Sequence, residues 1–155
     1  MEENNYEEIK TVFTQMGKQE SLFEALYSRV ASAFGLTTCE MWIFYFLLIE
    51  ENGITQRDIC SQMNFKKQTV NSAVSKLVKN GMLTLSAADG NSKNKILMLT
   101  PEGREFAQRT VNQLLEAELK AAKKFGSKKL NSFCKLRDEY YGTLLREFEK
   151  DFLKD

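Results

Sequence analysis

The stretch 55-TQRDICSQMNFKKQTVNSAVSKLVK-79 decides the fold of this chain. Thr55 opens a short amphipathic helix that ends near Met63, and Asp58 follows it at capping-box spacing. Asn64-Phe65 breaks the helical pattern, and a second helix runs from about Lys66 to Asn80. Two short helices joined by a tight break predict a helix-turn-helix.

The second helix of this stretch separates an apolar face from a polar, basic face. Val70, Ala73, Val74, Leu77 and Val78 recur at helical spacing and predict the buried side. The outer side carries amides that can pair with adenine, hydroxyls that bond bases or phosphates, and lysines that neutralise phosphate. The segment from Thr55 to Lys79 has five basic residues and one acidic residue, so its net charge is +4, whereas the net charge of the whole chain is +1. An ordinary amphipathic helix with a solvated basic face would have the same sequence pattern. The elements around this helix favour the DNA-binding interpretation.

That context is a hairpin directly after the helix. Gly81 is placed to end the helix in the left-handed conformation, and then the apolar period changes to two. Leu83 and Leu85 mark one strand, residues 96–99 mark a second, and the polar cluster 89–94 lies between them. A polar-tipped hairpin in this position is a wing.

The rest of the chain predicts long helices. Apolar residues at helical spacing predict helices over 6–34, 37–49, 101–124 and 128–152, and the second is apolar almost all round. Thr37 with Glu40, and Thr100 with Pro101, are typical helix starts. The expected fold class is mainly α with a small two- or three-stranded β wing. It is a winged helix-turn-helix with long N- and C-terminal helices.

The composition indicates which classes of function are not expected. The 155 residues include no histidine and three widely spaced cysteines, so we expect no metal site, no catalytic residues and no enzyme. No glycine-rich phosphate loop occurs, and no cofactor is expected. The longest apolar run, 41–49, is too short to cross a bilayer, and the acidic N-terminus is not a signal peptide. We therefore expect a cytoplasmic protein that does not associate with membranes.

The chain resembles the MarR-type transcriptional regulators over nearly its whole length. The resemblance rests on the order and spacing of five segments, which are 36–40 (LTTCE), 54–60 (ITQRDIC), 68–77 (QTVNSAVSKL), 80–83 (NGML) and 97–103 (LMLTPEG). It implies a single domain over 1–155, with a winged helix-turn-helix lobe at 36–100, its helix-turn-helix at 55–78 and its wing at 83–99. The segments 1–35 and 101–155 would be dimerisation helices.

The resemblance implies a homodimer in which the first and the last two helices intertwine across a two-fold axis. The apolar stripes at both chain ends agree with this, because they are too long for one small core to cover, although packing within one chain is the alternative. Such a dimer would read a pseudo-palindromic operator in double-stranded DNA, with half-sites about 10 base pairs apart. Most regulators of this type are repressors.

The predicted DNA contacts lie on the second helix, at the start of the first, and on the wing. They are Thr55, Gln56, Lys66, Lys67, Gln68, Thr69, Asn71, Ser72, Ser75, Lys76, Lys79, Lys93 and Lys95. We assign base reading to 68–72, and phosphate contacts to Lys67, Lys76 and Lys79. The wing departs from the family pattern, because Asn91-Ser92-Lys93 stands where Asp-x-Arg is usual, unless Asp89 replaces that acid. Lysine offers a point charge in place of a bidentate fork, so we expect the helix to carry more of the affinity.

The resemblance also suggests a signal. A small aromatic or lipophilic effector would bind beside an aromatic cluster of Phe23, Tyr27, Phe34, Trp42 and Tyr45, which equally fits core packing. Family zinc sensors use histidines, which this chain lacks, and family oxidant sensors carry a cysteine in the first helix, where none occurs. Cys39 lies in the first turn of its helix, where the dipole lowers a thiol pKa. We expect Cys60 in the core and Cys134 at the surface.

Two alternatives to a ligand-responsive regulator stay open at this point. The winged helix could dock on an acidic protein partner, an alternative that the arginine-poor wing keeps open. The regulator could instead respond to oxidants through Cys39.

Overall fold

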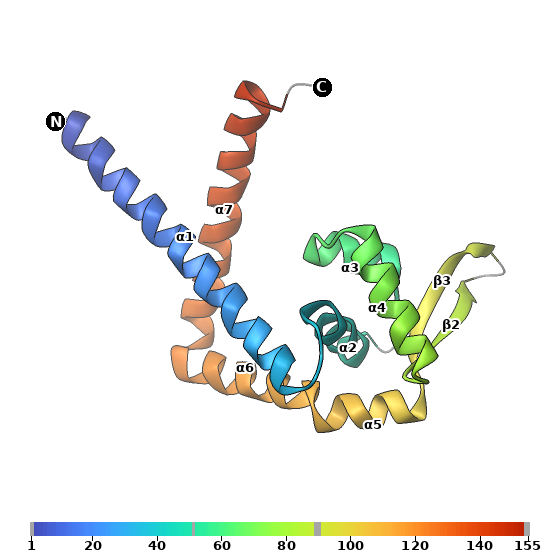
Figure 1. Ribbon diagram of the computed structural model, residues 1–155. Coiled ribbons are helices and arrows are strands. Elements are labelled where there is room, and N and C mark those ends of the chain that lie inside the picture. The colour runs from blue at the N-terminus through green and yellow to red at the C-terminus, as the bar shows by residue number, and fades with distance from the viewer. Residues whose placement is uncertain (1, 51, 89–90, 154–155) are drawn as a thin grey trace. The chain divides into compact units, whose positions relative to one another are not determined.

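The computed structural model describes residues 2–50, 52–88 and 91–153, with side chains described for 5–50, 52–86 and 95–153. The chain divides into two compact units, residues 1–114 and 115–155. In chain order the elements are α1 (Glu2–Ala33), α2 (Thr38–Ile49), β1 (Ile54–Thr55), α3 (Gln56–Met63), α4 (Lys67–Lys79), β2 (Leu83–Ala88), β3 (Asn91–Leu99), α5 (Pro101–Arg109), α6 (Val111–Phe125) and α7 (Ser127–Asp151) (Figure 1). The predicted fold class, mainly α with a small β wing, is confirmed.

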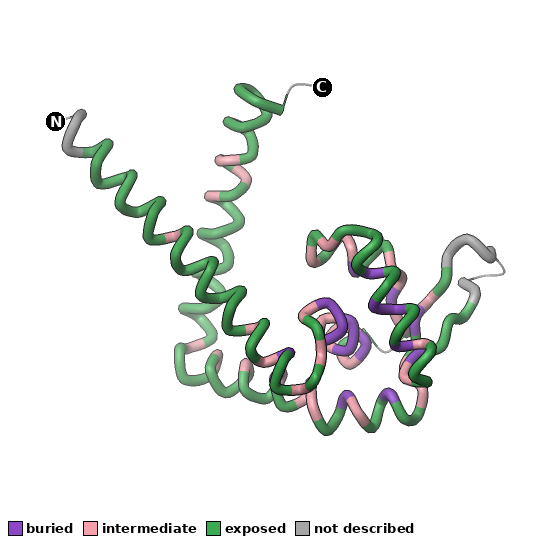
Figure 2. Tube along the Cα trace, in the orientation of Figure 1, coloured by how far each residue is buried: buried purple, intermediate pink, exposed green. Residues whose placement is uncertain are grey.

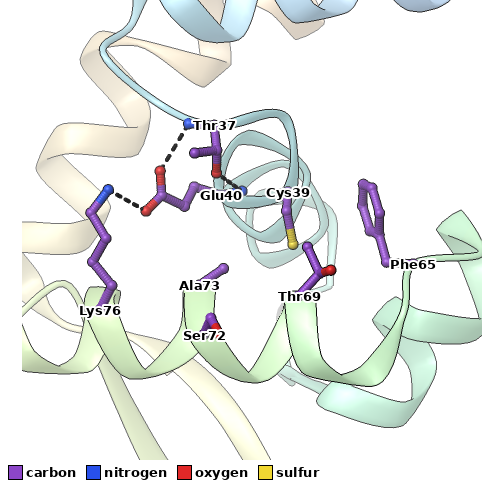
Figure 3. A pocket seen from close by; sticks show the side chains of 8 residues that line it. All are labelled: Thr37, Cys39, Glu40, Phe65, Thr69, Ser72, Ala73 and Lys76. Carbon is purple, nitrogen blue, oxygen red and sulfur yellow. Dashed lines mark hydrogen bonds and ion pairs between the residues drawn. The ribbon is translucent and has the colours of Figure 1, made fainter.

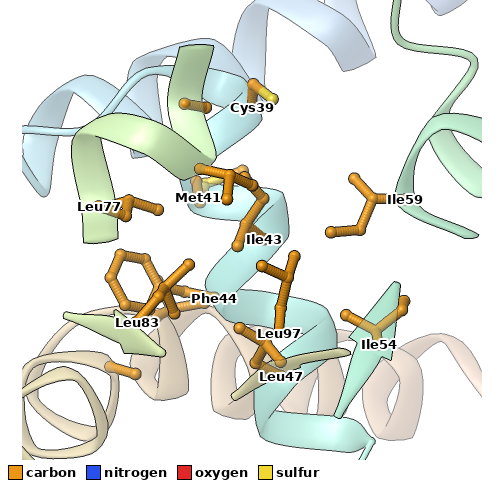
Figure 4. Close-up of a cluster of buried hydrophobic side chains, with 14 of the residues drawn as sticks. Cys39, Met41, Ile43, Phe44, Leu47, Ile54, Ile59, Leu77, Leu83 and Leu97 are labelled. Carbon is orange, nitrogen blue, oxygen red and sulfur yellow. The ribbon is translucent and has the colours of Figure 1, made fainter. Parts of the chain in front are cut away.

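Helix α2 is the centre of the first unit. Its side chains Met41, Ile43 and Phe44 are fully buried, and they meet residues of α4, the sheet and α5 (Figures 2 and 4). Thr37 and Glu40 form the predicted capping box at its start. An almost wholly apolar helix is stable only when other elements surround it, and here the winged lobe is built around it.

The small sheet connects the start of the helix-turn-helix to the wing. It has the strand order β1-β3-β2, with both pairings antiparallel. Strand β1 pairs Ile54 with Leu97 and Thr55 with Ile96. The first helix of the motif therefore starts from a strand that is hydrogen-bonded to the wing.

The end of α4 is connected to the start of α5. Gly81 takes the predicted left-handed conformation, with φ +72°. The hydroxyl of Thr100 donates to the Gly81 carbonyl at 2.6 Å and accepts from the Gly103 N–H at 2.9 Å. Gly103 lies so close to Met82 that a Cβ added there would be 1.9 Å from the Met82 carbonyl oxygen. The cap of α5 thus also holds the C-terminal end of α4.

Several helix boundaries differ from the prediction, and α1 begins at Glu2 instead of near residue 6. The helix expected over 101–124 breaks at Thr110, whose φ and ψ of −123° and −81° leave the helical region. Neither proline nor glycine marks that break; the Thr110 hydroxyl bonds instead to the Phe106 carbonyl. At the start of α7, Ser127 is the first helical residue, and Gly126 holds the cap position with φ +101° and no side-chain cap.

The long helices α1 and α7 expose apolar side chains. On α1 these include Ile9, Val12 and Phe13, each between 43% and 49% exposed, and Leu22 at 71%. None of the described residues of α7 is buried, although Phe133, Leu145 and Phe148 follow the predicted stripe.

Among the described residues, no single helix is long and apolar enough to cross a membrane. Helices α1 and α2 pass that test only when they are joined across a bend of 84°. Helix α2 also has the buried environment of a core helix.

Candidate nucleic-acid interface

The helix-turn-helix forms where the sequence predicts it. Thr55 caps α3, and its hydroxyl accepts from the Asp58 N–H at 3.2 Å and donates to the Asp58 carboxylate at 2.6 Å. Asn64 ends α3 in the left-handed conformation, with φ +51°. Asparagine tolerates this conformation better than most residues, so the tight break before α4 follows from the residue at that position. Thr55, which we predicted to bind DNA, is half-buried and uses its hydroxyl in the cap.

Helix α4 presents its polar face to solvent as predicted. Val70, Ala73, Val74 and Leu77 are buried against the core. The exposed residues of the predicted contact set on and next to this helix are Lys66, Lys67, Gln68, Thr69, Asn71, Ser72, Ser75, Lys76 and Lys79. Gln56, on α3, is half-buried.

The start of α4 differs from the starts of the other helices in the lobe. Thr37, Thr55 and Thr100 each cap a helix through a side-chain hydroxyl, whereas Lys66 makes no such bond. No acid occurs in the first turn of α4, and Lys66 and Lys67 lie there. A helix start without a side-chain cap and with adjacent lysines has the electrostatics that attract a phosphate.

Sequence reasoning did not find the buried partner of Lys76. The Lys76 ammonium lies 2.7 Å from Oε1 of Glu40, whose side chain is 2% exposed, whereas that of Lys76 is 58% exposed. The second carboxylate oxygen, Oε2, accepts from the Thr37 N–H at 2.8 Å. Glu40 was recognisable in the sequence as a capping residue, but its pairing depends on how α4 packs on α2.

Burial and hydrogen bonding act in opposite directions on this carboxyl group. Burial alone raises the pKa of Glu40, but the bonds from Lys76 and from Thr37 outweigh it and hold the pKa below its usual value. Glu40 is therefore charged at neutral pH, and its charge is paired. Lys76 remains a predicted phosphate contact, although its ammonium is already paired with Glu40.

A pocket of about 360 Å³ lies between α2 and α4, next to this ion pair (Figure 3). Thr37, Cys39 and Glu40 line it from the start of α2. From the other side it is lined by Phe65, Thr69, Ser72, Ala73 and Lys76. Three of the predicted DNA contacts, Thr69, Ser72 and Lys76, therefore border α2. The pocket is not lined by a second stripe of exposed α4 residues, which consists of Gln68, Asn71, Ser75 and Lys79.

The wing is described only in part. Lys95 is exposed on β3. The side chain of Lys93 and all of Asp89 lie outside the described residues, so their predicted roles stay predictions.

The aromatic cluster predicted for an effector packs largely on itself. The rings of Phe23 and Tyr27 are 4.6 Å apart, Tyr27 stacks on Trp42 at 5.1 Å, and Trp42 meets Tyr45 edge-on at 4.9 Å. Phe34 is half-buried against the core. None of the five lines the pocket between α2 and α4, so the effector assignment stays a prediction.

The environment of Cys39 is the reverse of the one expected. Burial, with smaller contributions from the Glu40 carboxylate and Cys60, raises the pKa of the Cys39 thiol to about 11. The prediction that the helix start lowers this pKa is wrong, because the thiol is only 5% exposed. Cys60 packs partly buried against the core, and Cys134 is exposed, as expected. In the described part of the chain, no three His, Cys, Asp or Glu side chains gather as a metal site.

Residues 34–92, which hold α2, the helix-turn-helix and most of the wing, match the sequence model of the MarR family. No curated protein matches the chain by sequence. The part of the chain that carries the winged helix-turn-helix is therefore similar to the MarR family.

Solved structures share the fold at low sequence identity. A MarR family regulator from Neisseria meningitidis is 19% identical, with a TM-score of 0.76 over 89% of this chain and 96% of that one. A putative MarR family regulator from Listeria monocytogenes, solved with a 26mer DNA, is 17% identical, with a TM-score of 0.65 over 90% and 94%. MepR of S. aureus, in a DNA complex, is 14% identical, with a TM-score of 0.65 over 82% and 96%. These similarities show the fold.

Proposed function

We propose that this protein is a homodimeric transcriptional regulator that binds a pseudo-palindromic operator in double-stranded DNA. The observation that carries the proposal is the exposed face of α4, with its amides, hydroxyls and lysines and its start without a side-chain cap. Amide side chains at Gln68 and Asn71 can bond adenine edges in the major groove. The DNA complexes of the Listeria protein and of MepR support the same use of this fold.

The homodimer is supported by the apolar faces of the long helices. Exposed apolar stripes of this length are unusual on a monomer and mark an interaction surface. A second copy of the chain would cover the stripes of α1 and α7, as the dimerisation role predicted for 1–35 and 101–155 requires. A two-fold dimer would place its two α4 helices in successive major grooves about one helical turn apart.

The proposal also includes the protein's role, its location and its regulation by a ligand. The protein acts as a repressor in the cytoplasm, where it reaches its operator, and it binds its partners without catalysing a reaction. A small aromatic or lipophilic ligand that favours one spacing of the two α4 helices would change its DNA affinity. The aromatic cluster around Tyr27 and Trp42 is the proposed binding region.

Selection of bound fragments from genomic DNA, followed by binding curves, tests the proposal. We expect a specific duplex to be recovered, and Gln68→Ala with Asn71→Ala to lose about 1–3 kcal/mol of base discrimination at particular positions. Gln108→Ala is the control, because Gln108 is an exposed amide on α5, outside the predicted face. Full discrimination by the double variant would contradict the placement of the reading face. A protein that selects no DNA would instead support the acidic-partner alternative.

A further inference from the structure

We propose that Glu40 is a positioning residue that sets the orientation of α4 on α2, and with it the base discrimination of the regulator. This inference rests on the proposed DNA-binding function. The structure supports it through the fixed geometry of Glu40, the pocket beside it, and the inward direction of Lys76.

Glu40 is a fixed acceptor. Its side chain is 2% exposed, and Oε2 is held by the Thr37 N–H at 2.8 Å. In return, the Thr37 hydroxyl accepts from the Glu40 N–H at 3.2 Å. This reciprocal cap is local to α2, so the direction of the other oxygen, Oε1, is set before α4 contributes anything. An ammonium group that bonds Oε1 must come to a defined point.

Packing leaves the orientation of α4 less well defined than this bond does. Val70 and Val74 are buried, and apolar contacts of this kind are strong but not directional. Along the side that faces α2, the exposed Thr69 and Ser72 and the buried Ala73 border a pocket of about 360 Å³. Among the described residues, the bond between Lys76 and Glu40 is the one ion pair that joins α2 to α4.

The consequence for DNA binding follows from where Lys76 lies. It is two turns after Gln68 and five residues after Asn71 on the same helix. A small rotation of α4 about its axis would move both amides relative to the base edges, and paired hydrogen bonds are sensitive to such displacements. Phosphate contacts tolerate the same rotation better, because they depend mainly on charge. Loss of the ion pair should thus reduce discrimination more than total affinity.

The alternative is that Lys76 serves DNA directly as a phosphate anchor, as the sequence alone suggested. The two roles predict opposite behaviour for Glu40→Gln. If Lys76 is an anchor, removing the carboxylate frees the ammonium, and DNA binding stays the same or tightens. If Glu40 positions α4, the same change weakens specific binding even though one more free positive charge faces solvent.

Binding curves for the operator and for a random duplex over a range of salt concentrations distinguish these roles. The variants are Glu40→Gln, Lys76→Met, their combination, and Lys76→Arg, which keeps the ion pair. Lys79→Met is the matched control, because Lys79 is exposed on α4 and has no ion pair among the described residues. Circular dichroism and the thermal midpoint establish that each variant is folded.

We expect Glu40→Gln and Lys76→Met each to reduce the ratio of specific to non-specific binding by about tenfold. The salt slope should stay unchanged, the double variant should be no worse than the worse single one, and Lys76→Arg should restore the ratio. Lys79→Met should weaken both duplexes equally. If Glu40→Gln does not fold, Lys76→Met and Lys76→Arg decide the question, because Lys76 is largely exposed.

The inference is overturned if Glu40→Gln keeps the full ratio, or if Lys76→Met lowers the salt slope by about 0.9 with the ratio intact, as removal of one phosphate interaction would. Failure of the wild-type protein to bind any duplex would overturn the proposed function itself. The wild-type and variant curves therefore separate the two failures.

Discussion

The ammonium of Lys76, on α4, lies 2.7 Å from the buried carboxylate of Glu40, on α2. This pair connects the central helix of the lobe to the helix that carries the predicted DNA-reading face. A carboxylate that is removed from water is stable only when it is paired and hydrogen-bonded, and Glu40 satisfies both conditions through Lys76 and Thr37. The pair has consequences for stability that can be measured without DNA.

The stability of the wild-type protein should fall in acid because of Glu40. Its pKa is lowered from the usual value of 4.5, so the folded state favours the charged form. Its contribution is fully present above the unfolded-state pKa and is lost as the pH falls through the folded-state pKa. We expect Glu40→Gln to cost about 1.5–3 kcal/mol at pH 7.

Urea unfolding at a series of pH values checks this. The difference between the wild type and Glu40→Gln should shrink as the pH falls below 4.5. A difference that stays constant from pH 7 into the acid range would show that the charge of Glu40 does not stabilise the fold.

Gly103 should not accept any side chain. A Cβ at this position would lie 1.9 Å from the carbonyl oxygen of Met82, so the start of α5 or the end of α4 would have to move. We expect Gly103→Ala to destabilise the protein by about 1–3 kcal/mol, as is typical of overpacking. The control is Gly17→Ala on α1, where a Cβ meets nothing within 4 Å and alanine favours the helix. Equal unfolding midpoints for the two variants would refute the close approach.

The three cysteines should differ in reactivity with a thiol reagent at neutral pH. Cys39 is buried and its pKa is raised to about 11, so little thiolate is present and little of it is accessible. Cys134 is exposed and should label first. Mass spectrometry of the native protein during labelling measures the order. Labelling of Cys39 before Cys134 would support the oxidant-sensing alternative, which the structure otherwise argues against.

Much of the fold could be predicted from local sequence because its boundaries have local causes. The caps at Thr37, Thr55 and Thr100, and the left-handed Gly81, are each determined by residues within a few positions. The break at Thr110 has no such signal, since Thr11, Thr14 and Thr143 make the same hydroxyl-to-carbonyl bond inside unbroken helices. Local chemistry thus predicts where helices begin more reliably than where they bend.

The candidate DNA-binding site was likewise predictable only where its features depend on local sequence. Helical period alone was enough to place Gln68, Asn71 and Ser75 on the exposed face of α4. The partner of Lys76 is 36 residues away in the sequence, and its carboxylate reads locally only as a cap. The predicted lowering of the Cys39 pKa is wrong for a related reason. The helix start is visible in the local sequence, whereas the burial that raises this pKa comes from tertiary packing. Interactions between elements were the part that sequence reasoning could not supply.

The salt dependence of operator binding by the wild type and Lys67→Ala tests the central claim most directly. Lys67 is exposed in the first turn of α4, beside the start without a side-chain cap. We predict a linear fall of log K with log salt for the wild type. Alanine cannot neutralise a phosphate. The slope for Lys67→Ala should therefore be less steep than that of the wild type by about 0.9 for each phosphate that Lys67 neutralises. Binding that does not depend on salt, or identical slopes for the two proteins, would contradict the claim that α4 is the DNA-binding helix.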